Sequence, residues 1–173
     1  NNGIACVTID HAGNVWVCYD WQGYGVSMYD GSVWTSYTAT DGLADDDVND
    51  IAVDAEGDIW VGTYGSGVSE FDGTTWTFLS AADPDNNGNA MIPYGTGIVI
   101  DFGASGLWFY DGTNWSQFSA LTTDFMWVYG NNLFVGDFGA AGVWQFDGTN
   151  WIQLSISDPD NNGNAFVDVN LVN

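Results

Sequence analysis

Short runs of alternating apolar and polar residues recur along the chain, and clusters of Gly and Asp separate them. One group of four such runs occupies residues 48–53, 59–64, 68–71 and 76–80. Each run is rich in Val, Ile, Thr and aromatic residues, which are typical of strands. Apolar residues do not recur at the three-to-four spacing of an amphipathic helix. The pattern therefore predicts a four-stranded unit over residues 41–80.

A turn motif that ends in tryptophan, D-G-x-x-W, occurs four times. It lies at residues 30–34, 72–76, 111–115 and 147–151, at offsets of 42, 39 and 36 residues. A four-stranded unit cannot cover both faces of its own sheet, so neighbouring units must stack, and radial stacking at this period gives a β-propeller. We expect an all-β propeller-type array of four-stranded antiparallel blades, which forms a single domain over residues 1–173 or part of a longer one. The expected blades are approximately residues 4–38, 48–80, 90–119 and 125–155.

The first two units resemble the two-component-regulator propeller repeat, which occurs in sensor regions of bacterial signalling proteins and in secreted bacterial proteins. The resemblance rests on the pattern I-x-x-D-x-x-G-x-x-W-V, which residues 7–17 and 51–61 follow. The third and fourth units keep the second half of the blade and lose this hairpin. The resemblance implies the fold and says little about activity, because propellers host many unrelated functions.

The charge balance excludes several classes of partner. The chain of 173 residues contains 23 acidic residues and one His, and it has no Lys or Arg. Without cations it cannot neutralise phosphates, so we expect neither nucleic-acid binding nor direct binding to an anionic membrane. Turn chemistry explains many of the Asp residues. The surplus charge implies self-repulsion, which screening or bound cations must relieve.

Two loops carry the sequence D-x-D-x-N-G-N, which resembles the first half of calcium loops such as those of EF-hands and dockerins. Oxygen ligands at positions one, three, five and seven converge around a Gly at position six. The expected ligands are Asp83, Asp85, Asn87 and Asn89 in one loop and Asp158, Asp160, Asn162 and Asn164 in the other. The usual Glu at position twelve is missing, so we expect calcium to bind with modest affinity. The alternative is a Pro-Asp-Asn-Gly turn that binds nothing.

The two cysteines face each other in the first predicted hairpin. Pairing Ile9 with Val15 places Cys6 opposite Cys18, within disulfide reach. Two buried free thiols are the alternative. A disulfide implies an oxidising compartment, so we expect an extracellular or cell-surface location. Asn114 begins the one N-x-S/T sequon and is a candidate glycosylation site.

Aromatic and acidic residues recur in the loops between the second and third strands of the blades. In a propeller, these loops share one rim with the links between blades. Exposed rings beside carboxylates suit neutral sugars, through stacking and hydrogen bonds to hydroxyl groups, and they suit cations. The candidate ligand-binding residues are Asp20, Trp21, Tyr24, Tyr64, Asp101, Phe102, Asp137 and Phe138. The alternative is that the aromatic rings fold inward and pack between blades.

No set of residues typical of an enzyme is present. The sequence contains no Ser/His/Asp or Cys/His set and no phosphate loop, so we do not expect catalysis. We expect an extracellular structural or adhesive module that calcium stabilises. The alternative, which the family resemblance implies, is a ligand-sensing ectodomain of a bacterial signalling protein that binds a glycan.

Residues 165–172 form one more alternating strand after the four blades. Three outcomes are open: the chain is a fragment of a longer propeller, the two terminal strands compete for one place, or this strand completes the sheet of a neighbouring molecule. Strand addition between copies runs head to tail and generates rings or filaments. We favour this third outcome and expect self-association through the strand into a fibre or surface layer.

Overall fold

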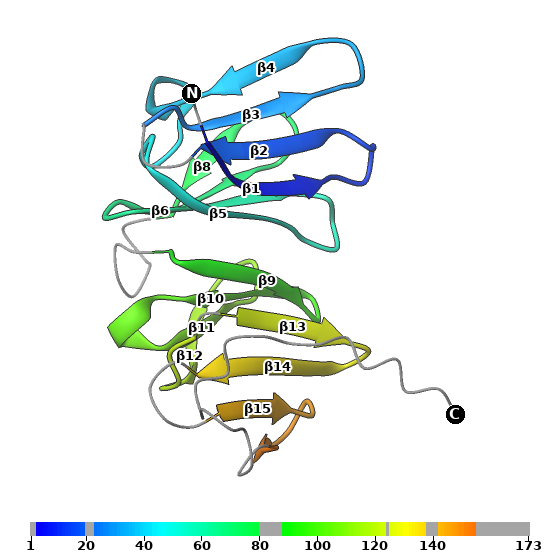
Figure 1. The fold of residues 1–173 in the computed structure, drawn as a ribbon, viewed down its shortest axis with the longest axis vertical. Helices are drawn as coiled ribbons and strands as arrows, with labels where there is room; N and C mark the ends of the chain where they lie inside the picture. The colour runs from blue at the N-terminus through cyan, green and yellow to red at the C-terminus, as the bar shows by residue number, and fades with distance from the viewer. Residues whose placement is uncertain (1–2, 20–22, 80–87, 124, 138–141, 155–173) are drawn as a thin grey trace.

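The described part of the chain forms four sheets of four antiparallel strands (Figure 1). The computed structural model describes residues 3–19, 23–79, 88–123, 125–137 and 142–154. Blade 1 contains β1 (Ile4–Ile9), β2 (Val15–Tyr19), β3 (Val26–Tyr29) and β4 (Trp34–Tyr37). Blade 2 contains β5 (Val48–Val53), β6 (Ile59–Thr63), β7 (Gly67–Phe71) and β8 (Trp76–Phe78).

The second half of the chain repeats this arrangement. Blade 3 contains β9 (Ala90–Tyr94), β10 (Gly97–Asp101), β11 (Leu107–Tyr110) and β12 (Trp115–Ser119). Blade 4 contains β13 (Phe125–Tyr129), β14 (Asn132–Asp137), β15 (Gly142–Phe146) and β16 (Trp151–Gln153). Two short 3-10 helices, η1 (Ala39–Asp41) and η2 (Gly103–Ser105), lie in loops. The expected all-β array of four-stranded blades is confirmed.

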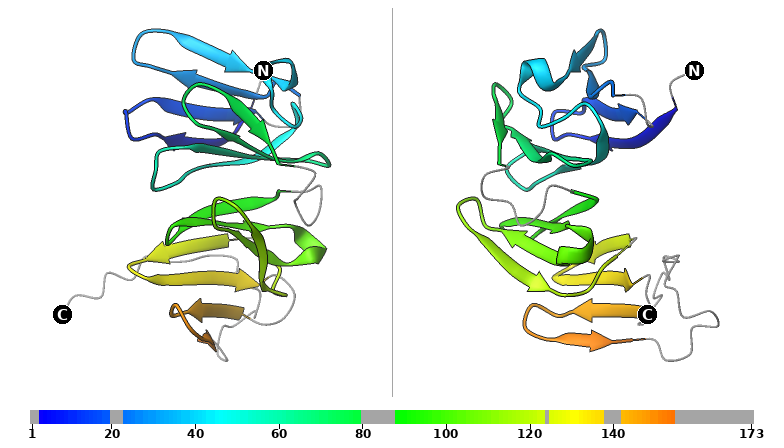
Figure 2. Two further views of the ribbon diagram at one scale, coloured as in Figure 1. Left: turned by 180° about the vertical axis from the view of Figure 1, so that it is seen from behind. Right: turned by 90° about the vertical axis from the view of Figure 1, so that its left-hand side faces the viewer.

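The blades stack in sequence order, so that blades 1 and 4 lie at opposite ends of the long axis (Figures 1 and 2). The first strand of each blade packs beside the first strand of the next, which places β1 beside β5, β5 beside β9, and β9 beside β13. Blades 2 and 3 therefore have a neighbouring blade on both faces. Among the four described blades, blades 1 and 4 have a neighbour on one face.

A carboxylate organises the first hairpin of blades 1 and 2. Asp54 Oδ1 accepts hydrogen bonds from three backbone N–H groups of the turn at 2.9–3.1 Å, and its Oδ2 accepts one from Trp60 Nε1 at 2.8 Å. Asp10 Oδ2 accepts the same bond from Trp16 Nε1 at 2.9 Å. These contacts explain why the repeat places a Trp six residues after an Asp.

The D-G-x-x-W motif forms the same turn between the third and fourth strands of every blade. In each turn the Asp side chain accepts hydrogen bonds from two backbone N–H groups at 2.7–2.9 Å. The following Gly has a φ between 89° and 95°, where a side chain would be strained. These hydrogen bonds hold the pKa of all four carboxyls below the usual range. The four residues are Asp30, Asp72, Asp111 and Asp147.

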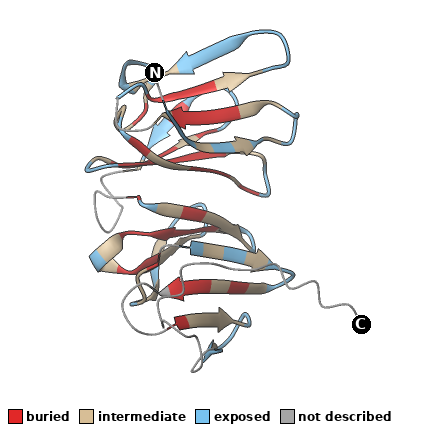
Figure 3. Cartoon of the chain, in the orientation of Figure 1, coloured by how far each residue is buried: buried red, intermediate tan, exposed pale blue. Residues whose placement is uncertain are grey.

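Three hydrophobic clusters lie between successive blades, and buried residues gather there (Figure 3). An aromatic pair bridges every junction. The pairs, with the distances between ring centroids, are Trp16 with Phe71 at 5.9 Å, Trp60 with Tyr110 at 5.6 Å, and Phe118 with Phe146 at 4.7 Å. The faces of the blades therefore form the core of the molecule, as expected for units that cannot bury both faces alone.

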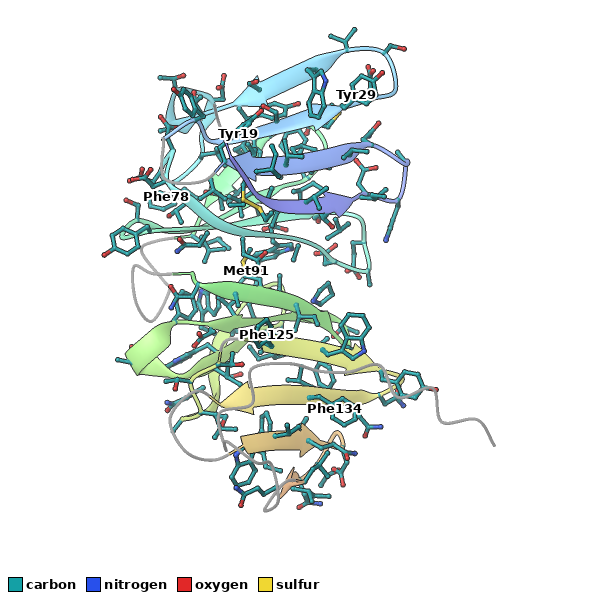
Figure 4. All side chains as sticks on the ribbon, in the orientation of Figure 1. Tyr19, Tyr29, Phe78, Met91, Phe125 and Phe134 are labelled. Carbon is teal, nitrogen blue, oxygen red and sulfur yellow. A yellow bond between two sulfur atoms is a disulfide. The ribbon has the colours of Figure 1, made fainter. Side chains whose placement is uncertain are left out.

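Cys6 and Cys18 form a disulfide, drawn as a yellow bond in Figure 4. The predicted register is observed, because Cys6 pairs with Cys18 and Ile9 pairs with Val15. The two Cα atoms are 5.1 Å apart. Both cysteines pack into the cluster between blades 1 and 2, so the bond joins the two innermost strands of blade 1 at the core.

Candidate ligand-binding rim

The link between blades 1 and 2 carries three consecutive acidic residues, Asp45 to Asp47. It begins at η1, where Thr38 N donates a hydrogen bond to Asp41 Oδ2 at 2.8 Å. Leu43 follows, is 4% exposed and packs into the cluster between the two blades. The acidic run therefore starts from a fixed point of the core.

The acidic run lies between two loops, one from each blade. Gly25 N donates a hydrogen bond to Asp46 O at 3.0 Å, and Tyr64 N donates one to Asp47 O at 2.8 Å. Gly25 belongs to the loop between β2 and β3, and Tyr64 belongs to the loop between β6 and β7. The backbone of the run thus joins two loops that are far apart in the sequence.

Hydrogen bonds orient two of the three carboxylates. Ser66 Oγ donates to Asp45 Oδ2 at 2.8 Å, and Ala39 N donates to Asp46 Oδ1 at 2.6 Å. Partial burial raises the pKa of Asp45, but the hydrogen bonds, above all that from Ser66, outweigh burial and hold this pKa below its usual range. Asp45 is therefore ionised at neutral pH. Asp47 is exposed.

Two exposed tyrosines flank the acidic run. Tyr24 is 45% exposed, and its ring packs edge-on against Tyr19 with 6.0 Å between centroids. Tyr64 is 63% exposed. We call Tyr24, Tyr64 and Asp45 to Asp47 the rim site. Aromatic faces beside carboxylates can stack on a sugar ring and accept hydrogen bonds from its hydroxyl groups, or can bind an organic cation.

The corresponding loop of blade 3 differs from the prediction. Phe102 is 0% exposed and packs edge-on against Trp115 with 5.5 Å between centroids. Asp101 is 2% exposed, and its Oδ1 accepts a hydrogen bond from Gly103 N at 3.0 Å. The expectation that these two side chains face a ligand is wrong, because both are buried and Phe102 packs into the cluster between blades 2 and 3.

Several other predicted residues fall at or beyond the edge of the described chain. Asp137 is the last residue of β14, where it pairs with Gly142. Asp20, Trp21 and Phe138 lie outside the described residues.

The predicted calcium loops also lie almost entirely outside the described residues. The residues concerned are Asp83, Asp85 and Asn87 of the first loop and Asp158, Asp160, Asn162 and Asn164 of the second. Asn89 is described and exposed, and its backbone N donates a hydrogen bond to Asp101 O at 2.9 Å. Among the residues that the structure describes, no group of three or more His, Cys, Asp or Glu side chains is arranged to hold a metal ion. Calcium binding stays a prediction, as does the strand at residues 165–172, which is not described.

Asn114, the candidate glycosylation site, lies in the outer turn of blade 3. It is exposed, and its backbone N donates a hydrogen bond to Asp111 Oδ1 at 2.7 Å. The Asn side chain is therefore at the surface, where a sugar would attach without entering the core.

Between blades 2 and 3 lies a partly buried carboxylate, Asp50, that the sequence pattern does not indicate. Asp50 Oδ2 accepts a hydrogen bond from Met91 N at 2.8 Å, and its Oδ1 accepts one from Ile51 N at 2.8 Å. Figure 4 labels Met91 at this junction. Burial raises the pKa of Asp50 to about 6, although both hydrogen bonds lower it. The corresponding position of blade 1 is Cys6, so the repeat alone does not indicate an acid here.

The sheets, the repeated turns and the stacking of blades define a β-propeller-type protein. Residues 42–65 match the model of the two component regulator propeller family. The resemblance seen in the sequence is thereby confirmed for this repeat of blade 2 and the link before it. A search of curated proteins finds no match.

Known structures share the fold at low sequence identity. The extracellular domain of a putative hybrid two component system from B. thetaiotaomicron matches with a TM-score of 0.67 and 14% identity, over 90% of this chain and 25% of that chain. PorZ, a surface component of the type-IX secretion system of Porphyromonas gingivalis, matches with a TM-score of 0.63 and 22% identity, over 84% of this chain and 25% of that chain. This chain therefore spans about a quarter of the length of these proteins.

One similar structure is an enzyme. A catalytically inactive virginiamycin B lyase from Staphylococcus aureus, solved with quinupristin, matches with a TM-score of 0.72 and 13% identity, over 91% of this chain and 57% of that chain. At this identity the likeness shows the fold alone. In the described part of the chain, no helix has the length and hydropathy needed to cross a membrane.

Proposed function

We propose that this chain is a ligand-binding propeller module of an extracellular protein, and that its rim site binds a neutral carbohydrate. The observation that carries the proposal is the pair of exposed tyrosines, Tyr24 and Tyr64, in the two loops whose backbones are hydrogen-bonded to the acidic run at one blade junction. A sugar ring that stacks on one tyrosine would place its hydroxyl groups near the carboxylates. Asp47 is the exposed acceptor of the run.

The charge of the chain narrows the class of ligand. Because the protein has 23 acids and no Lys or Arg, it repels phosphorylated, sulfated and carboxylated ligands. Carboxylates accept hydrogen bonds and cannot donate them when ionised, so they favour a ligand that is rich in donor hydroxyl groups. A neutral glycan or glycan fragment meets both conditions.

An extracellular or cell-surface location is part of the proposal. The disulfide between Cys6 and Cys18 is typical of oxidising compartments. Similar structures include extracellular domains of putative signalling systems and a bacterial surface component. These features support a sensing role in which the rim site reads a sugar outside the cell.

Binding of neutral and acidic oligosaccharides to the full chain, measured by calorimetry or on a glycan array, tests the proposal. We expect neutral glycans to bind, and we expect Tyr64→Ala and Tyr24→Ala each to weaken binding about tenfold through loss of ring contact. Phe78→Ala is a matched control, because Phe78 is 48% exposed and lies outside the rim site. Preferential binding of acidic glycans, or equal binding by both tyrosine variants and the wild type, would contradict a carbohydrate role for this rim.

A structural or adhesive module is the second candidate. It is favoured by the exposed apolar side chains of blades 1 and 4, which include Ile9 at 63% and Trp127 at 57% exposure. In this candidate calcium stabilises the module and offsets its negative charge, and residues 165–172 join neighbouring copies into a fibre or layer. Melting curves with and without calcium, and the mass of a chain that lacks residues 165–173, test this candidate.

A further inference from the structure

Each blade has two faces, and the three junctions show how these faces pair. We call the face that packs against the preceding blade the front face, and the face that packs against the following blade the back face. Directly paired residues of neighbouring strands lie on the same side of a sheet, so strand pairing assigns residues to faces. On the front face of blade 2, Ile51 and Trp76 are buried against blade 1 at 6% and 9% exposure. Every junction joins one front face to one back face.

Blade 1 has the same front face, and none of the other three described blades lies against it. Strand pairing places Val7, Val17, Ser27 and Ser36 in one row of this face and Ile9, Val15, Tyr29 and Trp34 in the next. Val7 is 65% exposed, whereas its counterpart Ile51 in blade 2 is 6% exposed. Trp34 is 54% exposed, whereas its counterpart Trp76 is 9% exposed. Val17 and Ser27, in the middle of the first row, are buried at 7% and 2% exposure, so the exposed part of this face lies on β1 and β4.

Blade 4 presents the opposite surface, a back face. Strand pairing places Phe125, Gly136 and Val143 in one row of this face and Trp127, Phe134, Gln145 and Ile152 in the next. Trp127 is 57% exposed and Tyr129 is 71% exposed. Their counterparts in blade 3, Ile92 and Tyr94, pack into the cluster between blades 3 and 4. The two ends of the molecule thus carry one front face and one back face.

Neither end face carries a charged residue in these rows, although the chain has 23 acids. The acids of blade 1 and blade 4 that belong to the outer turns, Asp30 and Asp147, lie at the ends of the strands. Exposed apolar side chains in rows without charge, in so acidic a chain, are typical of surfaces that become buried in a protein contact.

We propose that a second copy of this chain covers both end faces, with the back face of blade 4 in each copy packed on the front face of blade 1 in the other. The new contacts continue the series of three internal junctions. Because a front face meets a back face, the association is head to tail and stops only when a ring closes. Propellers typically have about four to eight blades, and the four described blades of two copies give a ring of eight. The ring does not use the rim site.

Ionic strength is expected to control the ring. Each copy brings 23 acidic residues, so repulsion opposes association at low salt. The rows of the end faces carry no charge, so salt screens the repulsion between the acidic residues of the two copies without weakening the contact itself. The dimer should therefore become tighter as salt rises, in contrast to a dimer that is held by ion pairs.

Sedimentation equilibrium or light scattering of the full chain at about 0.5 M NaCl tests the ring. We expect twice the monomer mass of 18.7 kDa. Ile9→Asp on the front face and Trp127→Asp on the back face each place a carboxylate in the contact, and each should weaken dimerisation at least about 100-fold. Tyr129→Asp is a second back-face variant. Phe78→Asp, at a residue 48% exposed and outside both end faces, is the matched control and should leave the dimer intact.

A mixture of the two variants tests the head-to-tail geometry. Ile9→Asp keeps an intact back face and Trp127→Asp keeps an intact front face, so the mixture should form a one-to-one dimer through a single junction, although each variant alone is monomeric. The altered side chains are already exposed, so melting temperatures should stay within a few degrees of wild type. A monomeric wild type at every concentration, a dimer that tolerates both variants, or a mass above two chains would each overturn the ring.

Discussion

Asp50 Oδ2 accepts a hydrogen bond from the backbone N of Met91 at 2.8 Å, so a carboxylate of blade 2 is bonded to the innermost strand of blade 3. Asp50 lies at a bulge of β5, where the pairing with β6 shifts between Val48 and Asp50. Burial removes water from the ionised carboxylate, and the pKa rises from 3.8 to about 6. The stability of this junction therefore depends on pH.

We expect the free energy of unfolding to rise as the pH falls from 7 towards 4. At pH values well above 6, Asp50 is ionised in the folded and unfolded states, and the folded state bears the cost of burial, at most about 3 kcal/mol. This cost disappears once the pH falls below 3.8, where both states are protonated. Burial also raises the pKa of Glu70 and Asp58. These two groups therefore change the free energy of unfolding with pH in the same direction as Asp50. Urea unfolding at a series of pH values measures the slope.

Asp50→Asn should reduce this slope, because the amide does not titrate and its Oδ1 can still accept the bond from Met91 N. Asp72→Asn is the control. Hydrogen bonds from Thr74 and Thr75 hold the pKa of Asp72 below its usual range. The stability that the ionised Asp72 contributes to the folded state is therefore lost only at lower pH. A slope between pH 4 and 6 that survives Asp50→Asn unchanged would show that other carboxyls cause it.

The hairpin carboxylate of blade 2 should contribute more to the free energy of unfolding than the turn carboxylates do. Asp54 is 8% exposed and accepts bonds from three backbone N–H groups and from Trp60 Nε1. Asp54→Ala leaves these donors without a partner and should cost about 3 kcal/mol of unfolding free energy. Asp72→Ala, in an exposed turn, should cost about 1 kcal/mol because water replaces the side chain. Equal costs in denaturant unfolding would contradict this ranking.

The features that the sequence predicts well are those with local causes. An Asp followed by Gly at a left-handed φ makes the same turn in every blade, so the repeat was sufficient to predict the four sheets. The register of the first hairpin follows from its turn, and it placed Cys6 opposite Cys18. In both cases the determining residues lie within about ten positions of each other.

The burial of loop residues was not predictable, because it depends on contacts that are distant in the sequence. Tyr64 and Phe102 each follow the second strand of a blade, yet they are 63% and 0% exposed. The ring of Phe102 packs against Trp115, whereas the backbone of Tyr64 is bonded to the acidic link. The partial burial of Asp50 was not predictable for the same reason, since the strand position of Asp50 is local and its contact with Met91 belongs to blade 3.

Calcium should stabilise the chain if the two D-x-D-x-N-G-N loops bind it. An ion that binds only the folded state adds RT ln(1 + [L]/Kd), or about 2.7 kcal/mol at a hundredfold excess over Kd. It would also offset part of the charge of the 23 acids. Melting curves in chelator and in millimolar calcium measure the effect, with Asp83→Asn and Asp158→Asn as loop variants. A melting temperature that does not change between the two conditions would rule both loops out as sites.

Residues 165–172 offer a second route to self-association, and truncation separates this route from the blade faces. Deletion of residues 165–173 removes the strand and leaves β1 to β16 intact. We expect the truncated chain to keep the mass of the full chain in light scattering at equal calcium and salt, because apolar end faces suffice for a front-to-back contact. If strand addition joins the copies instead, the truncated chain is smaller than the full chain, and Ile9→Asp in the full chain has no effect on mass. The two measurements together assign the contact, since truncation acts on the strand and Ile9→Asp acts on the front face of blade 1.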